Sequence, residues 1–273
     1  TPFLKVSMAF EDGYKAKGSV IISGGKALEK AEVFDKIFWD RLNLNFEKKN
    51  TEYVGFNSTH LHLAEGSEPS EVLLQFSVYD KDREKIRIFS ENIAPVILSG
   101  PPGVAVTGGR PRPHSVMTYW PTLVPKTEVT AVVKLLDTDG EVSESWEIPS
   151  LTGYEQETSV IKSEKQECRE SGQYTPPTLS DTRRVKFSEI CLARSGDKGD
   201  MVNIGVVARS AKIYEFLKEH LTAAYVKDLF EGLCKGPVTR YELPAVRALN
   251  FVVEGALAGG VTTSLRLDAH GKS

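Results

Sequence analysis

The sequence predicts an α+β protein with a larger mixed α/β unit, residues 1–156, and a small α+β unit, residues 185–273. Strand-like and helix-like runs follow one another in both units, but without the regular βαβ repetition of a doubly wound sheet. Between the units, residues 157–184 are polar, contain a pair of prolines and lack apolar periodicity, so we expect a linker there.

Alternating apolar residues predict the strands of the larger unit. The expected strands cover residues 3–10, 18–23, 51–57, 71–80, 114–124, 129–136 and 141–148. The first two are expected to form a hairpin, with Gly13 in the connection. Asp139 and Gly140 are typical of a tight turn before the last strand.

Two helices are expected in the same unit. Residues 24–43 carry apolar side chains at steps of three and four, and Ser23 is a possible N-cap. A second helix is indicated by Ile86, Phe89 and Ile93, and Pro95 should end or kink it.

The small unit reads as strands around two capped helices. Ser210 and Thr222 can each cap a helix, and Gly232 or Gly236 can stop the second one. The expected strands are residues 185–193, 202–209, 238–244, 248–255 and 265–269.

The composition is that of an ordinary globular protein, with 273 residues, a net charge of −3 and 40% hydrophobic residues. The mild acidity argues against a nucleic-acid partner, and no apolar run of 18 residues predicts a membrane span. Three widely spaced cysteines match neither a disulfide framework nor a zinc site, which favours a reducing compartment. The start, "TPFLKVSMAF", shows no signal peptide, and we read Thr1 as a boundary within something longer.

The segment "RSGDKGDMVN", residues 194–203, concentrates charge and glycine between two apolar runs. It contains Ser195, Gly196, Asp197, Lys198, Gly199, Asp200 and Asn203. Glycine-freed amides and Lys198 could bind an anion, whereas Asp197 and Asp200 could bind a hard cation. A polar turn whose aspartates cap neighbouring backbone is the structural alternative.

A second glycine-rich segment covers residues 247–264. Its polar residues, with one that follows it, are Arg247, Gly255, Gly259, Gly260, Thr262, Thr263, Ser264 and Arg266. Amides, hydroxyls and arginines suit a phosphate or carboxylate, but glycines can equally serve close packing in a sheet.

A third segment, residues 98–116, holds four prolines and four glycines, from which we expect no regular structure. Arg110 and Arg112 could meet an anion there and His114 could act as an acid or base, or the segment could be a rigid crossover. His60 and His62 could share a strand face as a metal pair does, but no third ligand is nearby.

Several long motifs together resemble the acyclic terpene utilisation family, the AtuA-like proteins. They are "ARSGDKGDMVNIGVVARS", "RYELPAVRALNFVVEGALAGGVTTSLRLDAHGK", "IAPVILSGPPGVAVTGGRPRP" and the opening "LKVSMAFEDGYKAKGSVIISGGKALEKA". The resemblance implies a ferredoxin-like fold for 185–273 and identifies 1–156 as the C-terminal part of the family's core domain. It also implies a missing N-terminal portion. At Asp200 the family more often has Asn, which disfavours a two-carboxylate metal site.

The resemblance further implies breakdown of branched acyclic terpenoids through acyl-CoA thioesters, by hydratase or C–C lyase chemistry. We therefore expect an enzyme of this class with Asp197 and Lys198 as catalytic residues. The expected ligand-binding residues are Ser195, Gly196, Gly199, Asn203, Arg247, Gly259, Gly260, Thr262 and Arg110. A non-catalytic binding module, or a metal-dependent hydrolase using Asp197, Asp200 and Asn203, are the alternatives.

The expected partners are a small acidic substrate, such as a CoA thioester, and the missing N-terminal portion of the same protein. We also expect a homo-oligomer, with no cofactor, metal, nucleic acid or membrane as a partner. The expected location is the cytoplasm, or the mitochondrial matrix if the source is eukaryotic.

Overall fold

The computed structural model describes residues 2–61, 68–148, 165–168 and 183–272. The chain divides into two compact units, one of residues 1–10 and 118–162 and the other of residues 11–117 and 163–273. The divisions after residues 10 and 117 both fall inside strands. The expected linker, 157–184, lies mostly outside the described residues.

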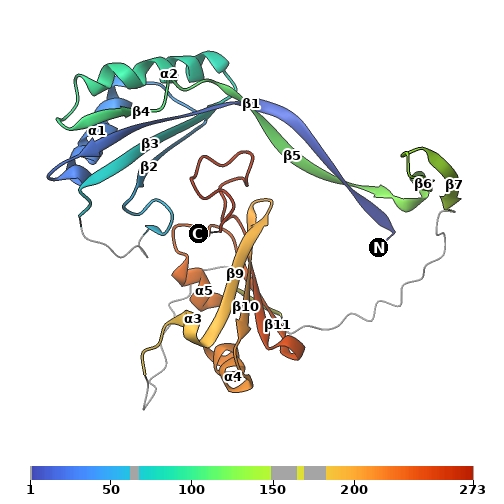
Figure 1. Cartoon of the computed structure of the whole chain (residues 1–273). Coiled ribbons are helices and arrows are strands. Elements are labelled where there is room, and N and C mark those ends of the chain that lie inside the picture. Colours follow the sequence, from blue (N-terminus) through green and yellow to red (C-terminus); the bar gives the residue numbers. More distant parts are fainter. Residues whose placement is uncertain (1, 62–67, 149–164, 169–182, 273) are drawn as a thin grey trace. The chain divides into compact units, whose positions relative to one another are not determined.

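A five-stranded antiparallel sheet organises the N-terminal half of the larger unit (Figure 1). Its strands are β1 (Phe3–Ser23), β2 (Lys48–Val54), β3 (Glu71–Asp80), β4 (Val104–Thr107) and β5 (His114–Pro125). Their order is β2-β3-β1-β4, and β5 also pairs with β1. Strands β1 and β3 are in register from Tyr14 opposite Asp80 to Ser23 opposite Glu71.

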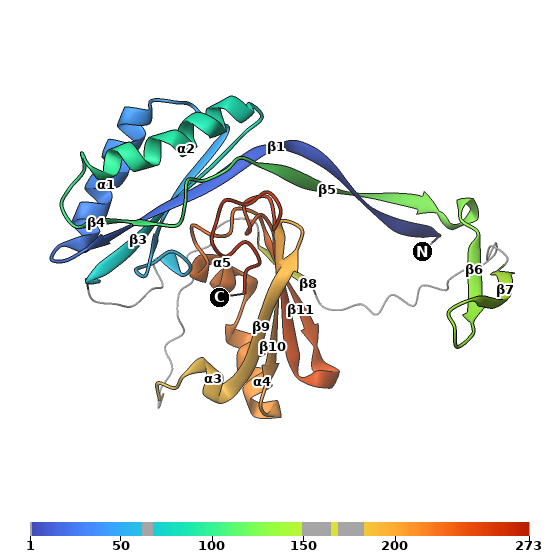
Figure 2. The ribbon, with the colours of Figure 1, turned by 45° about the horizontal axis from the view of Figure 1, so that its top comes forward.

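Helices α1 (Ala27–Leu42) and α2 (Arg83–Ile97) cover one face of this sheet (Figure 2). Four phenylalanines with no exposed surface fill the space between helices and sheet: Phe34, Phe38, Phe76 and Phe89. The Phe38 and Phe76 rings lie 4.3 Å apart, centroid to centroid. This aromatic core fixes the helices on the sheet, because fully buried aromatic side chains contribute the largest apolar areas.

The two expected helices are confirmed, but their ends differ from the prediction. Lys26, in a left-handed conformation, occupies the N-cap position of α1 where Ser23 was expected. Asn43 closes the helix by donating its N–H to the Trp39 carbonyl. Helix α2 continues two residues past Pro95, although the proline has no N–H to donate to the carbonyl four residues before it.

The expected hairpin at the N-terminus is wrong, because residues 3–23 form one continuous strand. Gly13 does adopt a left-handed φ of 90°, and a Cβ there would meet the Asp80 carbonyl at 2.9 Å. Pairing with β3 begins directly after it, at Tyr14, so the glycine makes a local irregularity instead of reversing the chain. The hydroxyl of Tyr79 donates to the Asp12 carbonyl at 2.6 Å and anchors this point.

The segment 98–116 was expected to lack regular structure, and this too is only partly right. Val104–Thr107 form β4, which pairs with β1 from Ser19 to Ile22. The prolines and glycines flank this short strand, so its backbone remains free to join the sheet edge.

The smaller compact unit combines the start of β1 and most of β5 with a separate β hairpin. The hairpin strands are β6 (Ala131–Leu136) and β7 (Val142–Ile148), preceded by a short 3-10 helix, η2 (Lys126–Glu128). The expected turn at Asp139–Gly140 is confirmed, and the Asp137 carboxylate accepts the N–H groups of Asp139 and Glu141.

The C-terminal part forms a second five-stranded antiparallel sheet with the order β8-β11-β12-β10-β9. The strands are β8 (Lys165–Cys168), β9 (Cys191–Lys198), β10 (Met201–Ala208), β11 (Val238–Leu243) and β12 (Ala248–Val253). The helical elements are α3 (Phe187–Ile190), α4 (Ala211–His220), α5 (Ala223–Leu229) and η3 (Pro244–Val246). Its core includes Val206, Leu217, Leu249 and Phe251.

The cap predictions for this part are confirmed. The Ser210 and Thr222 hydroxyls accept the N–H groups of Ile213 and Tyr225, at 3.3 and 3.1 Å. The expected end of the second helix is wrong, because α5 ends at Leu229, before Gly232 and Gly236.

The expected strands at the two ends of this part also differ. Residues 187–190 form a helix before β9, and 265–269 form no strand. Strand β8 lies within the segment expected to be a linker and pairs with β11. Among the described residues, none of the helices combines the length and apolar content that a membrane crossing requires.

Candidate functional site

The charged segment 194–203 is a β hairpin and not an open loop. Strand β9 runs to Lys198 and β10 starts at Met201, so only Gly199 and Asp200 form the turn. Gly199 has the left-handed φ of 64° that such a turn requires at its first position. The pairing places Gly196 opposite Asn203 and Lys198 opposite Met201. The charged side chains are therefore fixed on two paired strands.

A cationic groove lies along this hairpin. Its residues are Arg194, Gly196, Lys198, Asn203, Gly205 and Lys272, and Ser195 and Asp197 also contribute to the lining. A Cβ at Gly196 would come within 3.3 Å of the Lys272 Nζ, so the glycine lets this ammonium lie close over the strand. Within the described part of the chain, the three cationic side chains have no hydrogen bond or ion pair, and all three are exposed.

Asp197 and Lys198 are neighbours on β9, so strand alternation sends their side chains to opposite faces. No hydrogen bond joins these two side chains in the structure. Asp197 shares its face with Ser195 and with Val202, its partner on β10. The arrangement makes Asp197 available to a ligand instead of to Lys198.

Asp200 ties the hairpin turn to the second glycine-rich segment. Its Oδ1 accepts the N–H groups of Gly259, at 2.7 Å, and Leu257, at 3.2 Å. Its backbone carbonyl accepts the N–H of Ala256 at 3.0 Å. At Gly260, whose φ is 85°, a Cβ would meet the Gly199 carbonyl at 2.6 Å.

These contacts change the role of the second segment. The amides of Ala256, Leu257 and Gly259 satisfy Asp200, and Gly260 allows the close approach of two backbones. The sequence had left ligand binding and close packing open, and the geometry favours close packing for Gly259 and Gly260. The carbonyl of Thr262 accepts a hydrogen bond from the Lys15 ammonium at 2.7 Å. Burial is the main cause that lowers the pKa of Lys15, and the positive charge of Lys17 is the second.

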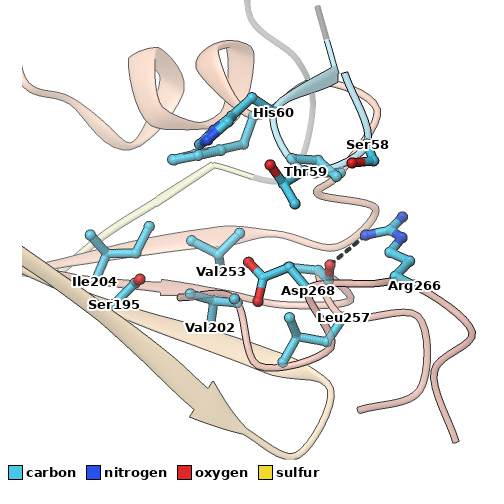
Figure 3. A pocket seen from close by; sticks show the side chains of 14 residues that line it. Ser58, Thr59, His60, Ser195, Val202, Ile204, Val253, Leu257, Arg266 and Asp268 are labelled. Atoms are coloured by element: carbon cyan, nitrogen blue, oxygen red, sulfur yellow. Dashed lines mark hydrogen bonds between the residues drawn. The ribbon is translucent and has the colours of Figure 1, made fainter. Parts of the chain in front are cut away.

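An apolar pocket lies beside β9 and β10 (Figure 3). Its apolar walls are Val202, Ile204, Phe230, Leu233, Val253 and Leu257. Its cavity volume is about 100 Å³. The lining, mainly aliphatic side chains with a few polar groups, is like that of a small-molecule site, but the volume is below the roughly 300–1,000 Å³ of such sites and is enough for one end of a ligand only.

A few polar side chains border this pocket. Figure 3 shows Arg266 donating to a backbone oxygen, and its guanidinium contacts the Ala256 carbonyl at 2.7 Å. The Asp268 carboxylate accepts the N–H of Lys272 at 3.0 Å, which positions the chain that carries the Lys272 ammonium. Ser195 lines both the apolar pocket and the cationic groove. Strand β9, at the edge of the sheet, therefore borders both the apolar pocket and the cationic groove.

Two of the expected ligand-binding residues lie elsewhere. Arg247 precedes β12, whose Ala248 pairs with Val207, so it lies six residues of β10, roughly 20 Å, from the hairpin turn. Arg110 forms an ion pair with Glu91 and lines a separate pocket on α2. The structure therefore brings together residues 195–200, Asn203 and 257–262, and leaves both of these arginines out.

A metal centre receives no geometric support. No group of three or more His, Cys, Asp or Glu side chains in the described ranges is placed to hold a metal ion. His60 is an exposed residue at the pocket, and His62 lies outside the described residues. Asp200, needed for the hydrolase alternative, is occupied by backbone amides.

Sequence reasoning missed Arg194, Lys272 and the apolar walls. The alternation of Arg194, Gly196 and Lys198 is a period-2 signal that could have indicated one polar face of a strand. The walls come from two strands, a helix end and a loop, so no single stretch of sequence contains their pattern.

Taken together, an apolar pocket and a cationic groove border the edge strand of a small antiparallel α+β domain. Two family models match the chain: the acyclic terpene utilisation family protein AtuA over residues 1–135, and the AtuA ferredoxin-like domain over residues 185–273. The chain belongs to the AtuA family, and its C-terminal domain is ferredoxin-like. No curated protein and no solved structure shows significant similarity to it.

Proposed function

We propose that this chain is part of an enzyme that breaks down acyclic terpenoids and acts on a branched-chain acyl thioester by hydratase or C–C lyase chemistry. The observation that carries the proposal is the position of Ser195, which lines both the apolar pocket and the cationic groove. A ligand with an apolar tail and an anionic head could occupy both at once. Membership of a family linked to acyclic terpene utilisation supports this class of substrate.

The apolar pocket is suited to the branched end of the hydrocarbon tail. Its walls of valine, leucine, isoleucine and phenylalanine favour methyl and methylene groups, each worth about 0.8 kcal/mol when removed from water. A branched chain fills such a pocket better than a linear one, since its methyl groups occupy width as well as length. Shape therefore supplies selectivity.

The groove is suited to the anionic part of a CoA thioester. Arg194, Lys198 and Lys272 bring three positive charges without a partner in the described structure. Phosphates pair well with such groups, because charge-assisted hydrogen bonds are about twice as strong as neutral ones. These exposed side chains also remain free to reorient around a flexible ligand.

The reacting group would then lie at β9, between tail and head. The Ser195 hydroxyl can donate to a thioester oxygen, on which negative charge develops in enolate-forming reactions. Asp197 shares the face of Ser195 and can transfer a proton to or from the neighbouring carbon. Lys198, on the other face, contributes charge to the CoA moiety and not to the reacting carbon.

Thermal unfolding and calorimetry of the full chain with a ten-carbon branched acyl-CoA test the proposal. The thioester should raise the melting temperature, because a ligand that binds the folded state stabilises it. Lys198→Gln should weaken binding roughly tenfold, the loss of one charge-assisted bond. The matched control is Lys212→Gln, which removes an exposed lysine on α4 and should leave binding unchanged.

The ligand series distinguishes the alternatives. If neither the thioester, free CoA nor the free branched acid shifts the melting temperature, the chain is a non-catalytic module and the proposal fails. Binding without turnover in the full-length protein would assign the groove but remove the catalytic roles. A cytoplasmic location agrees with Cys191 and Cys234, which are buried as thiols and not joined in a disulfide.

A further inference from the structure

The smaller compact unit, residues 1–10 and 118–162, has no hydrophobic core in its described part. Every described residue of 2–10 and 118–148 is exposed or only partly buried, and all residues of β6 and β7 are exposed. A two-stranded hairpin without a covered face is at best marginally stable in water. Something must cover this surface for the unit to be well ordered.

The exposed surface is strongly apolar. Sixteen large apolar side chains of this unit are more than a third exposed: Phe3, Leu4, Val6, Met8, Phe10, Tyr119, Trp120, Leu123, Val129, Val132, Val133, Leu135, Leu136, Val142, Trp146 and Ile148. Since large apolar side chains contribute on the order of 100 Å² each when partly exposed, the total is on the order of 1,000 Å² per copy. A stable interface of ordinary size buries roughly 800 Å² per partner.

The apolar side chains are arranged by strand pairing. Ala131 is paired with Ile148 and Val133 with Trp146, so these four side chains share one face of the hairpin. On β1, Leu4, Val6, Met8 and Phe10 alternate along the strand and therefore share a face. The Phe10 ring contacts Trp120 edge-on, with centroids 6.2 Å apart. Continuous apolar stripes of this kind mark an interaction surface.

The charges on these strands balance in sign. Residues 3–10, 118–125, 131–136 and 142–148 carry four charged side chains: Lys5, Lys134, Glu144 and Glu147. Lys134, Glu144 and Glu147 form no ion pair with another described residue. Two positive and two negative charges among apolar residues are self-complementary, since a two-fold axis can bring each lysine of one copy to a glutamate of the other.

The unpaired edges of β6 and β7 also favour a second copy of this chain as the partner. Strands β6 and β7 form a two-stranded sheet, so in the described structure each has one edge without a neighbouring strand. A two-fold axis perpendicular to a sheet pairs identical edge strands antiparallel. Centred on Val133, a β6–β6 pairing would place Ala131 opposite Leu135 and Val132 opposite Lys134, with no like charges opposed.

We propose that the strand residues 3–10, 118–125, 131–136 and 142–148 form a dimerisation surface that is covered by the same surface of a second copy of this chain. Balanced charge, the exposed apolar area and the open β edges favour an identical partner over an unrelated acidic or basic one. The surface is independent of the proposed ligand site, so either proposal can fail while the other stands.

Analytical ultracentrifugation of the full chain at micromolar concentration tests the dimer. Wild-type protein should sediment as a dimer, and Val133→Glu with Trp146→Glu should shift it to a monomer. Trp146 is 46% exposed, so its replacement should not unfold the larger unit. The control is Leu98→Glu, at a side chain 93% exposed outside this surface, which should remain dimeric.

A charge exchange gives a second test that does not depend on apolar burial. Glu144→Lys with Glu147→Lys should self-associate at least about tenfold more weakly, as should Lys5→Glu with Lys134→Glu, because all four charged side chains of these strands then have the same sign and the two copies repel each other. Mixing the two variants should restore a dimer. A monomeric wild type, a dimer unaffected by Val133→Glu with Trp146→Glu, or no recovery on mixing would overturn the proposal.

Discussion

The two sheets of the larger unit use their helix-covered faces differently. The N-terminal sheet, with α1 and α2, is closed by aromatic side chains such as Phe38 and Phe76, which have no exposed surface. The ferredoxin-like sheet has smaller aliphatic residues near its edge strand, where Val202 and Leu257 border a pocket. Under the proposed function this difference is a division of roles: the first sheet supplies stability and the second supplies the ligand site.

Removing a core aromatic side chain from the first sheet should have the largest effect. Phe76→Ala should lower the free energy of unfolding by about 3–5 kcal/mol, through lost burial and the cavity left behind. Urea denaturation measures this loss. Phe216→Ala, at a ring 44% exposed on α4, is the matched control and should cost far less. Equal losses at the two positions would contradict the division of roles.

Removing the carboxylate at the hairpin turn should have an intermediate effect. Asp200→Ala leaves the N–H groups of Leu257 and Gly259 without their acceptor, at a cost of about 1–2 kcal/mol for an exposed site. Faster hydrogen exchange at these two amides should accompany the loss. Asp200→Asn keeps an acceptor oxygen and should recover part of the stability; if it behaves like alanine, the contact is not what holds the segment.

Acidification should have the smallest effect on the free energy of unfolding, and this effect should arise in the N-terminal sheet. Burial alone would raise the pKa of Asp80, but the N–H of Asp82, the Lys85 ammonium and the N–H of Glu47 together lower it from 3.8. Because the folded-state pKa lies below the unfolded one, this stabilisation is complete above the unfolded pKa and is lost as the pH falls through the folded value.

The measurement is the unfolding free energy of wild type and Asp80→Asn from pH 7 to pH 2. The difference between the two proteins should be constant near neutrality and shrink below about pH 4. A difference that persists unchanged at pH 2 would show that the aspartate acts through its shape and not through its charge.

Local sequence signals predicted local structure well. The caps at Ser210 and Thr222 depend on residues three apart, and both were correct. Gly13 shows where such signals fail, because the same residue suits a turn or an irregularity within a strand. Only the distant partner β3, which pairs from Tyr14 onward, decides between them.

The candidate site shows the same limit. The concentration of charge at 194–203 was visible in the sequence, but its hairpin geometry was not, because polar residues can occupy a strand whose one face is open to solvent. The contact between Asp200 and Gly259 joins residues 59 positions apart, which no local pattern encodes. No local pattern predicts the distance between Arg247 and the hairpin turn, since this distance depends on the register of β10 and β12.

The division between the compact units crosses β1 after Phe10 and β5 after Met117, in the middle of two strands that pair with each other. Neither unit can thus be excised at that division without leaving a severed strand and a lost neighbour in the other. Recombination between genes would have to exchange both units as one cassette. A boundary that cuts no strand lies instead at the ferredoxin-like domain, whose match begins at residue 185.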